Sequence, residues 1–174
     1  MRVTHGCINT GNYFDDPGFV PYMGAVLINP GGDVQFRSET TEGQEVAQKL
    51  SSLGYVTFVV HYRVRPYTMQ EGALDLARAV RYVRSHADDY QIDEEDIAII
   101  GFSAGGILCG EEVLHYDGFV NGTSLDASYV SDELDEVSGD VHVLENMPHG
   151  FGIGREDSQW IIPFDERLSN IFEN

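Results

Sequence analysis

The sequence predicts an α/β fold built on a mostly parallel sheet with helices on both faces. Three short apolar or β-branched runs, at residues 25–28, 55–62 and 97–100, are typical of strands that are buried on both sides. Segments with the hydrophobic period of helices lie between these runs. Because strands that alternate with helices form parallel sheets, we expect a single α/β domain over residues 1–174.

The first expected elements are a lead-in, a strand and a helix. Residues 1–21 are rich in Gly, Asn, Asp and Pro without any periodicity, which predicts an irregular lead-in. The strand at residues 25–28 follows. Thr41, with Gln44 three residues later, is typical of a capping box and predicts a helix that continues to Gly54.

The same order of elements then repeats. The strand at residues 55–62 is followed by an apolar face shared among residues 73–83, which predicts a second helix. The strand at residues 97–100 ends at Gly101, and we expect another helix to open at residues 106–109.

The last third of the sequence is less regular. Residues 117–140 are polar and acidic, and we expect an irregular segment with one short helix at residues 131–137. Residues 141–144 are interpreted as one more strand. Apolar residues at helical spacing in residues 161–172 predict a final amphipathic helix.

Composition excludes two classes of partner. The chain carries 29 acidic against 10 basic residues, a formal net charge of −19, and Lys49 is the single lysine. Such an acidic protein repels phosphate backbones, so we expect no nucleic-acid partner. The apolar runs are too short to span a bilayer, so we expect no membrane partner either.

The two cysteines, Cys7 and Cys109, lie far apart and do not predict a disulfide. No histidine motif accompanies Cys109, which we interpret as a small buried hydrophobe rather than a catalytic thiol. The first residues lack the apolar stretch of a signal peptide, so the expected location is cytoplasmic.

The clearest chemical motif surrounds Ser103. Gly101 and Gly105 flank the serine in a G-x-S-x-G pattern between the strand at residues 97–100 and the helix that follows. Glycines at these positions permit the tight strand-to-helix turn that exposes a nucleophile. We therefore predict Ser103 as a nucleophile, and the alternative is a structural turn serine.

A serine nucleophile needs a base, and His149 is the best placed histidine. It follows the expected strand at residues 141–144, at the edge of the sheet where α/β sites form. The alternative is a loop histidine without a catalytic role. The remaining histidines have no spacing typical of a metal site, so we expect no metal: His5, His61, His86, His115 and His142.

Acyl transfer also needs hydrogen-bond donors for an oxyanion. The loop after the first strand, residues 29–33, is poor in side chains, so its backbone N–H groups are free to point inward. Gly32, Asp33 and Ala104 are the candidate donors. An ordinary turn after a strand would use the same residues.

Together these segments resemble the α/β-hydrolase superfamily, in particular its esterase/lipase branch with acetyl-xylan-esterase-like and feruloyl-esterase-like enzymes. The resemblance lies in residues 25–32, 60–64, 75–83 and 148–151 and in the turn at Ser103. It implies a three-layer α/β sandwich and a catalytic site without metal or organic cofactor. It also implies that Ser103 is the nucleophile, that His149 is its base, and that Gly32, Asp33 and Ala104 form the oxyanion hole.

The sequence departs from this family between the serine and the histidine. Relatives place two strands and the triad aspartate there, whereas only 45 residues separate Ser103 from His149 here. No aspartate in this interval follows an apolar strand, so the triad acid is unknown; the residues available are Asp117, Asp126, Asp132, Asp135 and Asp140. A shortened sheet would leave an exposed edge, which favours a homo-oligomer.

These observations predict a serine carboxylester hydrolase for small acyl esters, and the resemblance extends this to acetyl groups on carbohydrate. One alternative is a non-catalytic hydrolase remnant or binding domain that lacks the triad acid. Another is a serine peptidase or acyltransferase on the same fold, because the walls of the pocket choose the acyl acceptor.

Overall fold

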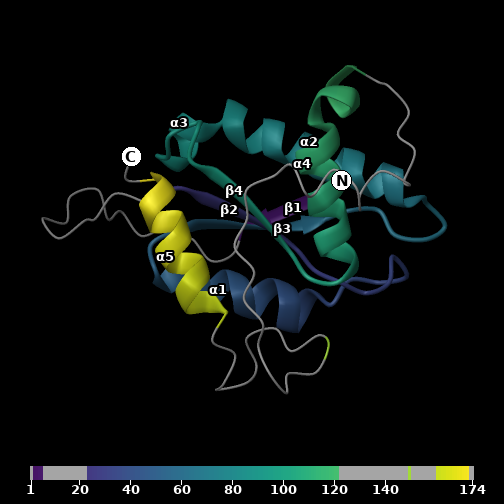
Figure 1. Ribbon diagram of the computed structural model, residues 1–174, viewed down its shortest axis with the longest axis horizontal. Helices are drawn as coiled ribbons and strands as arrows, with labels where there is room; N and C mark the ends of the chain where they lie inside the picture. Colours follow the sequence, from purple (N-terminus) through teal and green to yellow (C-terminus); the bar gives the residue numbers. More distant parts are fainter. Residues whose placement is uncertain (1, 6–22, 122–148, 150–159, 173–174) are drawn as a thin grey trace, which may run out of the picture.

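The computed structural model describes residues 2–5, 23–121, 149 and 160–172. Its centre is a four-stranded sheet in the order β1-β3-β2-β4 (Figure 1). The strands are β1 (Arg2–His5), β2 (Ala25–Asn29), β3 (Val56–His61) and β4 (Ile97–Gly101). All three strands predicted from the apolar runs are therefore present.

The sheet is mostly parallel, as predicted. β2 pairs in parallel with both β3 and β4, whereas β1 pairs antiparallel with β3. The expectation of an irregular lead-in over residues 1–21 is wrong at β1. A four-residue strand at a sheet edge is held by its hydrogen bonds to a distant strand, and no local periodicity signals it.

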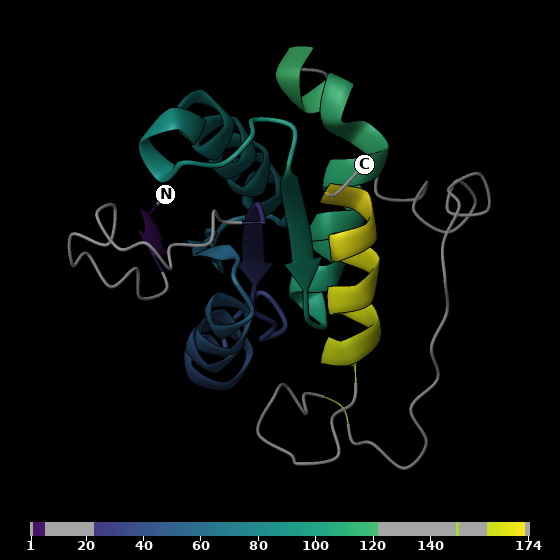
Figure 2. The ribbon, with the colours of Figure 1, turned by 90° about the vertical axis from the view of Figure 1, so that its left-hand side faces the viewer.

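Helices cover both faces of the sheet (Figures 1 and 2). The chain contains η2 (Glu39–Gln44), α1 (Glu45–Ser52), α2 (Met69–Ser85), α3 (Ala87–Tyr90), α4 (Ala104–Asn121) and α5 (Ile161–Phe172). Here η2 is a π-helix. This three-layer arrangement confirms the predicted α/β class.

The two faces of the sheet form separate hydrophobic cores. On one face, Leu27 and Phe58 pack with Leu76 of α2 and Leu108 of α4. On the other face, Ile28 and Val59 pack with residues of α1 and α5, such as Leu50 and Leu168. The strand side chains alternate between these cores, which is why the apolar runs in the sequence are continuous.

The start of the first helical region differs from the prediction. Thr41 lies inside η2, and neither η2 nor α1 has a side-chain cap, so a capping box at Thr41 is wrong. A capping box is present at the start of α2, where Thr68 and Glu71 bond reciprocally. After β2 and the loop at residues 30–38, the chain enters a π-helix, which pattern rules for α-helices do not anticipate.

The helix α4 also differs from the prediction at both ends. It begins at Ala104, two residues before the expected opening, and it continues to Asn121. The expectation of irregular structure from residue 117 is therefore wrong for residues 117–121, because a helix that has formed gains one backbone hydrogen bond with each residue added to it. The expected helix at 131–137 and strand at 141–144 lie outside the described residues. The predicted C-terminal amphipathic helix is confirmed as α5.

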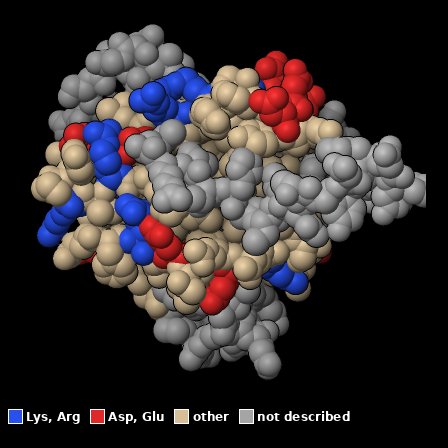
Figure 3. Space-filling model, turned by 180° about the vertical axis from the view of Figure 1, so that it is seen from behind, with Lys and Arg blue, Asp and Glu red and all other residues tan. Residues whose placement is uncertain are grey.

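Charges are unevenly distributed over the surface. Seen from behind, acidic side chains gather at the corner of the molecule where α3 lies (Figure 3). The chain around α3 exposes five acidic residues, Asp88, Asp89, Asp93, Glu94 and Glu95. No helix in the described part of the chain is both long and apolar enough to cross a membrane.

One carboxyl group is buried between α2 and α4. Glu112 is 3% exposed, and neither of its carboxyl oxygens has a hydrogen-bond partner among the described residues. Burial raises the pKa of Glu112 from 4.5 to about 7, against the opposing charges of Arg81 and Arg84. The folded state therefore holds this proton at pH values where the unfolded chain has released it.

We expect the Glu112→Gln variant to be more stable than the wild type at pH 8. As pH rises from about 4.5 through 7, the wild type loses stability because the unfolded chain releases this proton while the folded protein retains it, whereas glutamine does not titrate. The difference in Tm should be several degrees at pH 8 and should shrink at pH 5, as measured by circular dichroism. The exposed Glu94→Gln serves as control, and a pH-independent difference for Glu112→Gln would contradict the assignment.

Candidate active site

The topology of the sheet brings two loops together. β2 lies between β3 and β4 in the sheet. The next strand along the chain, β3, pairs with one edge of β2, and β4 later pairs with the other edge. The register pairs Asn29 with Gly101, so β2 and β4 end side by side. Ligands of open α/β sheets bind at such a reversal of strand order, outside the carboxyl ends of the strands. The two ends continue into residues 30–38 and into the turn at Ser103.

The turn at Ser103 has the geometry of an exposed nucleophile. Ser103 adopts a φ of 51°, in the left-handed region that residues with a side chain rarely occupy. A Cβ on Gly101 would lie 2.3 Å from the carbonyl oxygen of Gly105, and one on Gly105 would lie 2.0 Å from that of Asn29. Both flanking positions therefore require glycine for close backbone contact.

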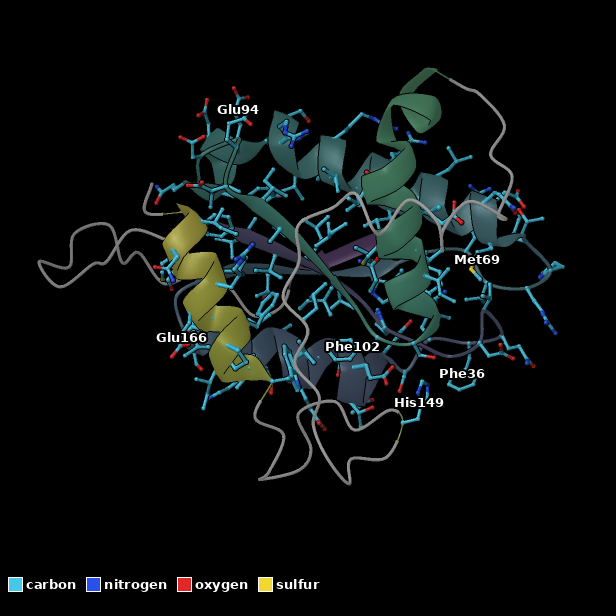
Figure 4. All side chains as sticks on the ribbon, in the orientation of Figure 1. Phe36, Met69, Glu94, Phe102, His149 and Glu166 are labelled. Atoms are coloured by element: carbon cyan, nitrogen blue, oxygen red, sulfur yellow. The ribbon has the colours of Figure 1, made fainter. Side chains whose placement is uncertain are left out.

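His149 lies beside this serine. Its Nε2 atom is 2.8 Å from Ser103 Oγ, a hydrogen-bond distance, although 46 positions separate the two residues. Figure 4 shows His149 at the same edge of the molecule as Phe102, which directly precedes the serine. For Nε2 to accept the serine proton, Nδ1 must carry the proton of the neutral imidazole. The two side chains are thus close enough for direct proton transfer.

The candidate oxyanion donors lie in the loop after β2 and at the first residue of α4. Gly32 and Asp33 have positive φ values of 136° and 54°, so the loop after β2 is sharply turned. Within the described residues, the amides of Gly32, Asp33 and Ala104 donate to no backbone acceptor outside regular structure. Ala104 is also the first residue of α4, where the helix dipole favours negative charge. These three amides are available to an incoming oxyanion.

Sequence reasoning missed two residues of this loop. The amide of Gly31 donates to Oε2 of Glu42 at 2.8 Å, and Glu42 is 4% exposed. A Cβ on Gly31 would lie 2.8 Å from the Cβ of Ser103. A glutamate at a polar position of a predicted helix gives no signal by itself, because its role depends on the fold of the loop.

Buried polar side chains fix the carboxyl end of β2 next to the site. Asn29 is fully buried, and its Nδ2 donates to the carbonyl of Ile100 at 3.2 Å and to Sγ of Cys109 at 3.4 Å. The hydroxyl of Tyr62 donates to the carbonyl of Pro30 at 2.6 Å. Burial raises the pKa of Cys109 to about 12 despite the hydrogen bond from Asn29. The thiol therefore remains protonated and is a poor nucleophile.

The triad acid stays unassigned. Asp117 lies within the helical backbone of α4, and Asp126, Asp132, Asp135 and Asp140 lie outside the described residues. Among the described residues, no carboxylate forms a hydrogen bond or ion pair with His149.

His61 and His86 have structural contacts instead. His61 lies 2.9 Å from a carboxylate oxygen of Glu39, and His86 stacks on Tyr82. The described part of the chain holds no group of three His, Cys, Asp or Glu residues able to bind a metal ion.

Comparison with known proteins places this geometry in a family. A family model described as BD-FAE matches residues 20–125, more than half of the chain. The chain belongs to the BD-FAE family. The match extends from just before β2 into the residues after α4, so it includes the Ser103 turn and the loop after β2 but not His149.

Two curated proteins are similar to this BD-FAE family member. It is 33% identical over 125 residues to endo-1,4-beta-xylanase B of Butyrivibrio fibrisolvens, covering 63% of this chain and 19% of that protein. It is 36% identical over 84 residues to an acetylxylan esterase of Xylanibacter ruminicola, covering 48% and 18% of the two chains. The chain therefore spans about a fifth of the length of these relatives.

Solved structures agree with the fold. An acetyl ester-xyloside bifunctional hydrolase from Caldicellulosiruptor lactoaceticus has a TM-score of 0.54 at 30% identity, covering 62% of this chain and 36% of that one. The α/β hydrolase MGS-M1 from a deep-sea metagenome library has a TM-score of 0.52 at 28% identity, covering 64% and 50%. The resemblance to an esterase-like α/β hydrolase is thus confirmed.

The left-handed backbone at residue 103 predicts that a glycine variant is more stable to unfolding than an alanine variant. We expect Ser103→Gly to be more stable than Ser103→Ala by about 1 kcal/mol, because glycine adopts a φ of 51° without a steric cost. Urea unfolding of both variants measures the difference. At Ser85, the last residue of α2, the order should reverse because alanine favours a helix. A more stable Ser103→Ala would contradict the left-handed conformation.

Cys109 should react slowly in the folded protein. In a Cys7→Ser background, we expect iodoacetamide at pH 8 to label native Cys109 at least about 100-fold more slowly than the urea-unfolded chain. The reason is that a thiol with a pKa of about 12 holds almost no thiolate at pH 8. Mass spectrometry of timed samples measures both rates. Comparable rates in the two states would contradict the buried environment.

Proposed function

We propose that this BD-FAE family member is a serine carboxylester hydrolase acting on small acyl esters. The observation that carries the proposal is the 2.8 Å distance between Ser103 Oγ and His149 Nε2 at a left-handed strand-to-helix turn. A serine hydroxyl becomes an effective nucleophile when an adjacent base accepts its proton. In the proposed mechanism His149 is that base, and its Nε2 lies within hydrogen-bond distance of Ser103 Oγ.

The proposed reaction has two stages. His149 accepts the proton of Ser103 while Oγ attacks the carbonyl carbon of the ester, and the amides of Gly32, Asp33 and Ala104 stabilise the oxyanion. The imidazolium then donates its proton to the departing alkoxide. In the second stage, His149 activates a water that attacks the acyl-enzyme, and Ser103 is released together with the carboxylic acid.

The proposed substrate is an acetyl ester on a carbohydrate. Two similar proteins are named an acetylxylan esterase and an acetyl ester-xyloside bifunctional hydrolase. Their names support acetyl as the acyl group and a sugar hydroxyl as the leaving group.

Ester hydrolysis should depend on both members of the serine–histidine pair. We expect Ser103→Ala and His149→Ala each to reduce kcat/KM for p-nitrophenyl acetate by about 10³-fold or more, because the pair acts as a unit. His86→Ala, which removes a histidine stacked on Tyr82, is the matched control and should retain activity. Near-UV circular dichroism checks that each variant is folded.

The alternatives have different signatures in this experiment. A folded wild type without serine-dependent turnover would overturn the proposal and leave a non-catalytic binding domain. Labelling of Ser103 by a fluorophosphonate without turnover would indicate a nucleophile without a working base. Cleavage of an acylated peptide amide in preference to acetylated xylan oligosaccharides would instead favour a peptidase.

A further inference from the structure

The mechanism above gives no role to a buried carboxylate beside the nucleophile. Glu42 lies in η2 and is 4% exposed, although most glutamates remain in water. Burial of a carboxylate is costly unless hydrogen bonds replace its hydration. The carboxylate of Glu42 accepts a hydrogen bond from the amide of Gly31, in the loop that carries the candidate oxyanion donors.

Three hydrogen bonds join Glu42 and the loop into a closed ring. The amide of Gly31 donates to Glu42 Oε2 at 2.8 Å, and the carbonyl of Gly31 accepts from the amide of Ser38 at 2.8 Å. The carbonyl of Ser38 in turn accepts from the amide of Glu42 at 3.0 Å. Both polar groups of Gly31 are therefore fixed, one of them by a charge-assisted bond of the stronger kind.

This ring lies directly against the nucleophile. The position that a Cβ on Gly31 would occupy is 2.8 Å from Ser103 Cβ, 2.7 Å from the carbonyl oxygen of Phe102 and 2.9 Å from Glu42 Oε2. The carboxylate, the loop and the turn thus meet at one point. The rotation of the peptides around Gly31 determines where the next amides, those of Gly32 and Asp33, are directed.

We propose that Glu42 is a positioning residue that directs the oxyanion-binding amides by binding the amide of Gly31. The expected effect of Glu42 on catalysis rests on the proposed esterase function. Its expected effect on the order of the loop rests only on the hydrogen-bond ring. Because Gly31 donates to Glu42, it is not itself an oxyanion donor. The neighbouring amides of Gly32 and Asp33 are left to face the substrate, where a displacement of about 1 Å costs roughly 10²-fold in rate.

The test compares Glu42→Ala and Glu42→Gln with Glu45→Ala, which removes a partly exposed carboxylate at the start of α1. We expect Glu42→Ala to lower kcat for p-nitrophenyl acetate by about 30- to 100-fold with KM within twofold, since oxyanion donors act in the transition state. Glu42→Gln should retain kcat within about fivefold, because its amide oxygen accepts the Gly31 proton. Glu45→Ala should match the wild type.

A second readout does not depend on catalysis. Hydrogen exchange of the peptide that spans residues 31–34, measured by mass spectrometry, should be at least about tenfold faster in Glu42→Ala than in wild type or Glu42→Gln. Unchanged exchange and unchanged kcat in Glu42→Ala would overturn the proposal. A Glu42→Gln variant as impaired as Glu42→Ala, with the loop still protected, would also overturn it, because the charge rather than the hydrogen bond would then matter.

The two proposals fail separately. If the wild type shows no serine-dependent turnover, the esterase function is lost, and the exchange data alone decide whether Glu42 orders the loop. If Glu42→Ala does not fold, Glu42→Gln and Glu42→Asp decide the question. Asp is one methylene shorter and should lose the bond to Gly31, so equal exchange and equal kcat in these two variants would contradict the positioning role.

Discussion

The left-handed backbone at Ser103 is the constraint on which the rest of the site depends. β4 must end and α4 must begin within two residues, and this is possible only where the chain turns with a positive φ. The parallel pairing of β2 with β4 brings the backbone of Asn29 against the turn, so Gly105 has no room for a side chain. The cost of the strained serine is met by the packing of the strand and helix on either side of it.

The same turn is supported from several directions. Phe102 packs edge-to-face on Trp160, with ring centroids 5.6 Å apart, so the approach to α5 contacts the residue just before the nucleophile. On the opposite side, Asn29 donates both to the end of β4 and to Cys109 in α4. The turn at Ser103 is therefore held by elements from three separate parts of the chain, which is the rigidity that the proposed catalytic role needs.

The loop after β2 is also held rigid, but by hydrogen bonds. Its backbone is held by hydrogen bonds rather than by apolar packing, because a loop that offers free amides to a substrate has few side chains with which to pack. Tyr62 fixes the carbonyl of Pro30, and Glu42 and Ser38 fix the two ends of Gly31. The amides of Gly32 and Asp33, which the proposed reaction uses, are among the loop amides that donate to no backbone acceptor in the described part of the chain. A buried glutamate in this place is a structural requirement of the loop.

The sequence by itself determined the α/β class, the three parallel strands, the last helix and the pairing of Ser103 with His149 as candidate residues. These follow from local signals: continuous apolar runs, helical periodicity, and glycines spaced around a serine. The tertiary structure alone decided the edge strand β1, the π-helix η2, the full extent of α4 and the contact of Glu42 with Gly31. Each of these features depends on contacts with residues distant in the sequence or on a backbone conformation that no residue pattern marks. Hydrogen bonds between distant segments leave no periodic signal in the sequence.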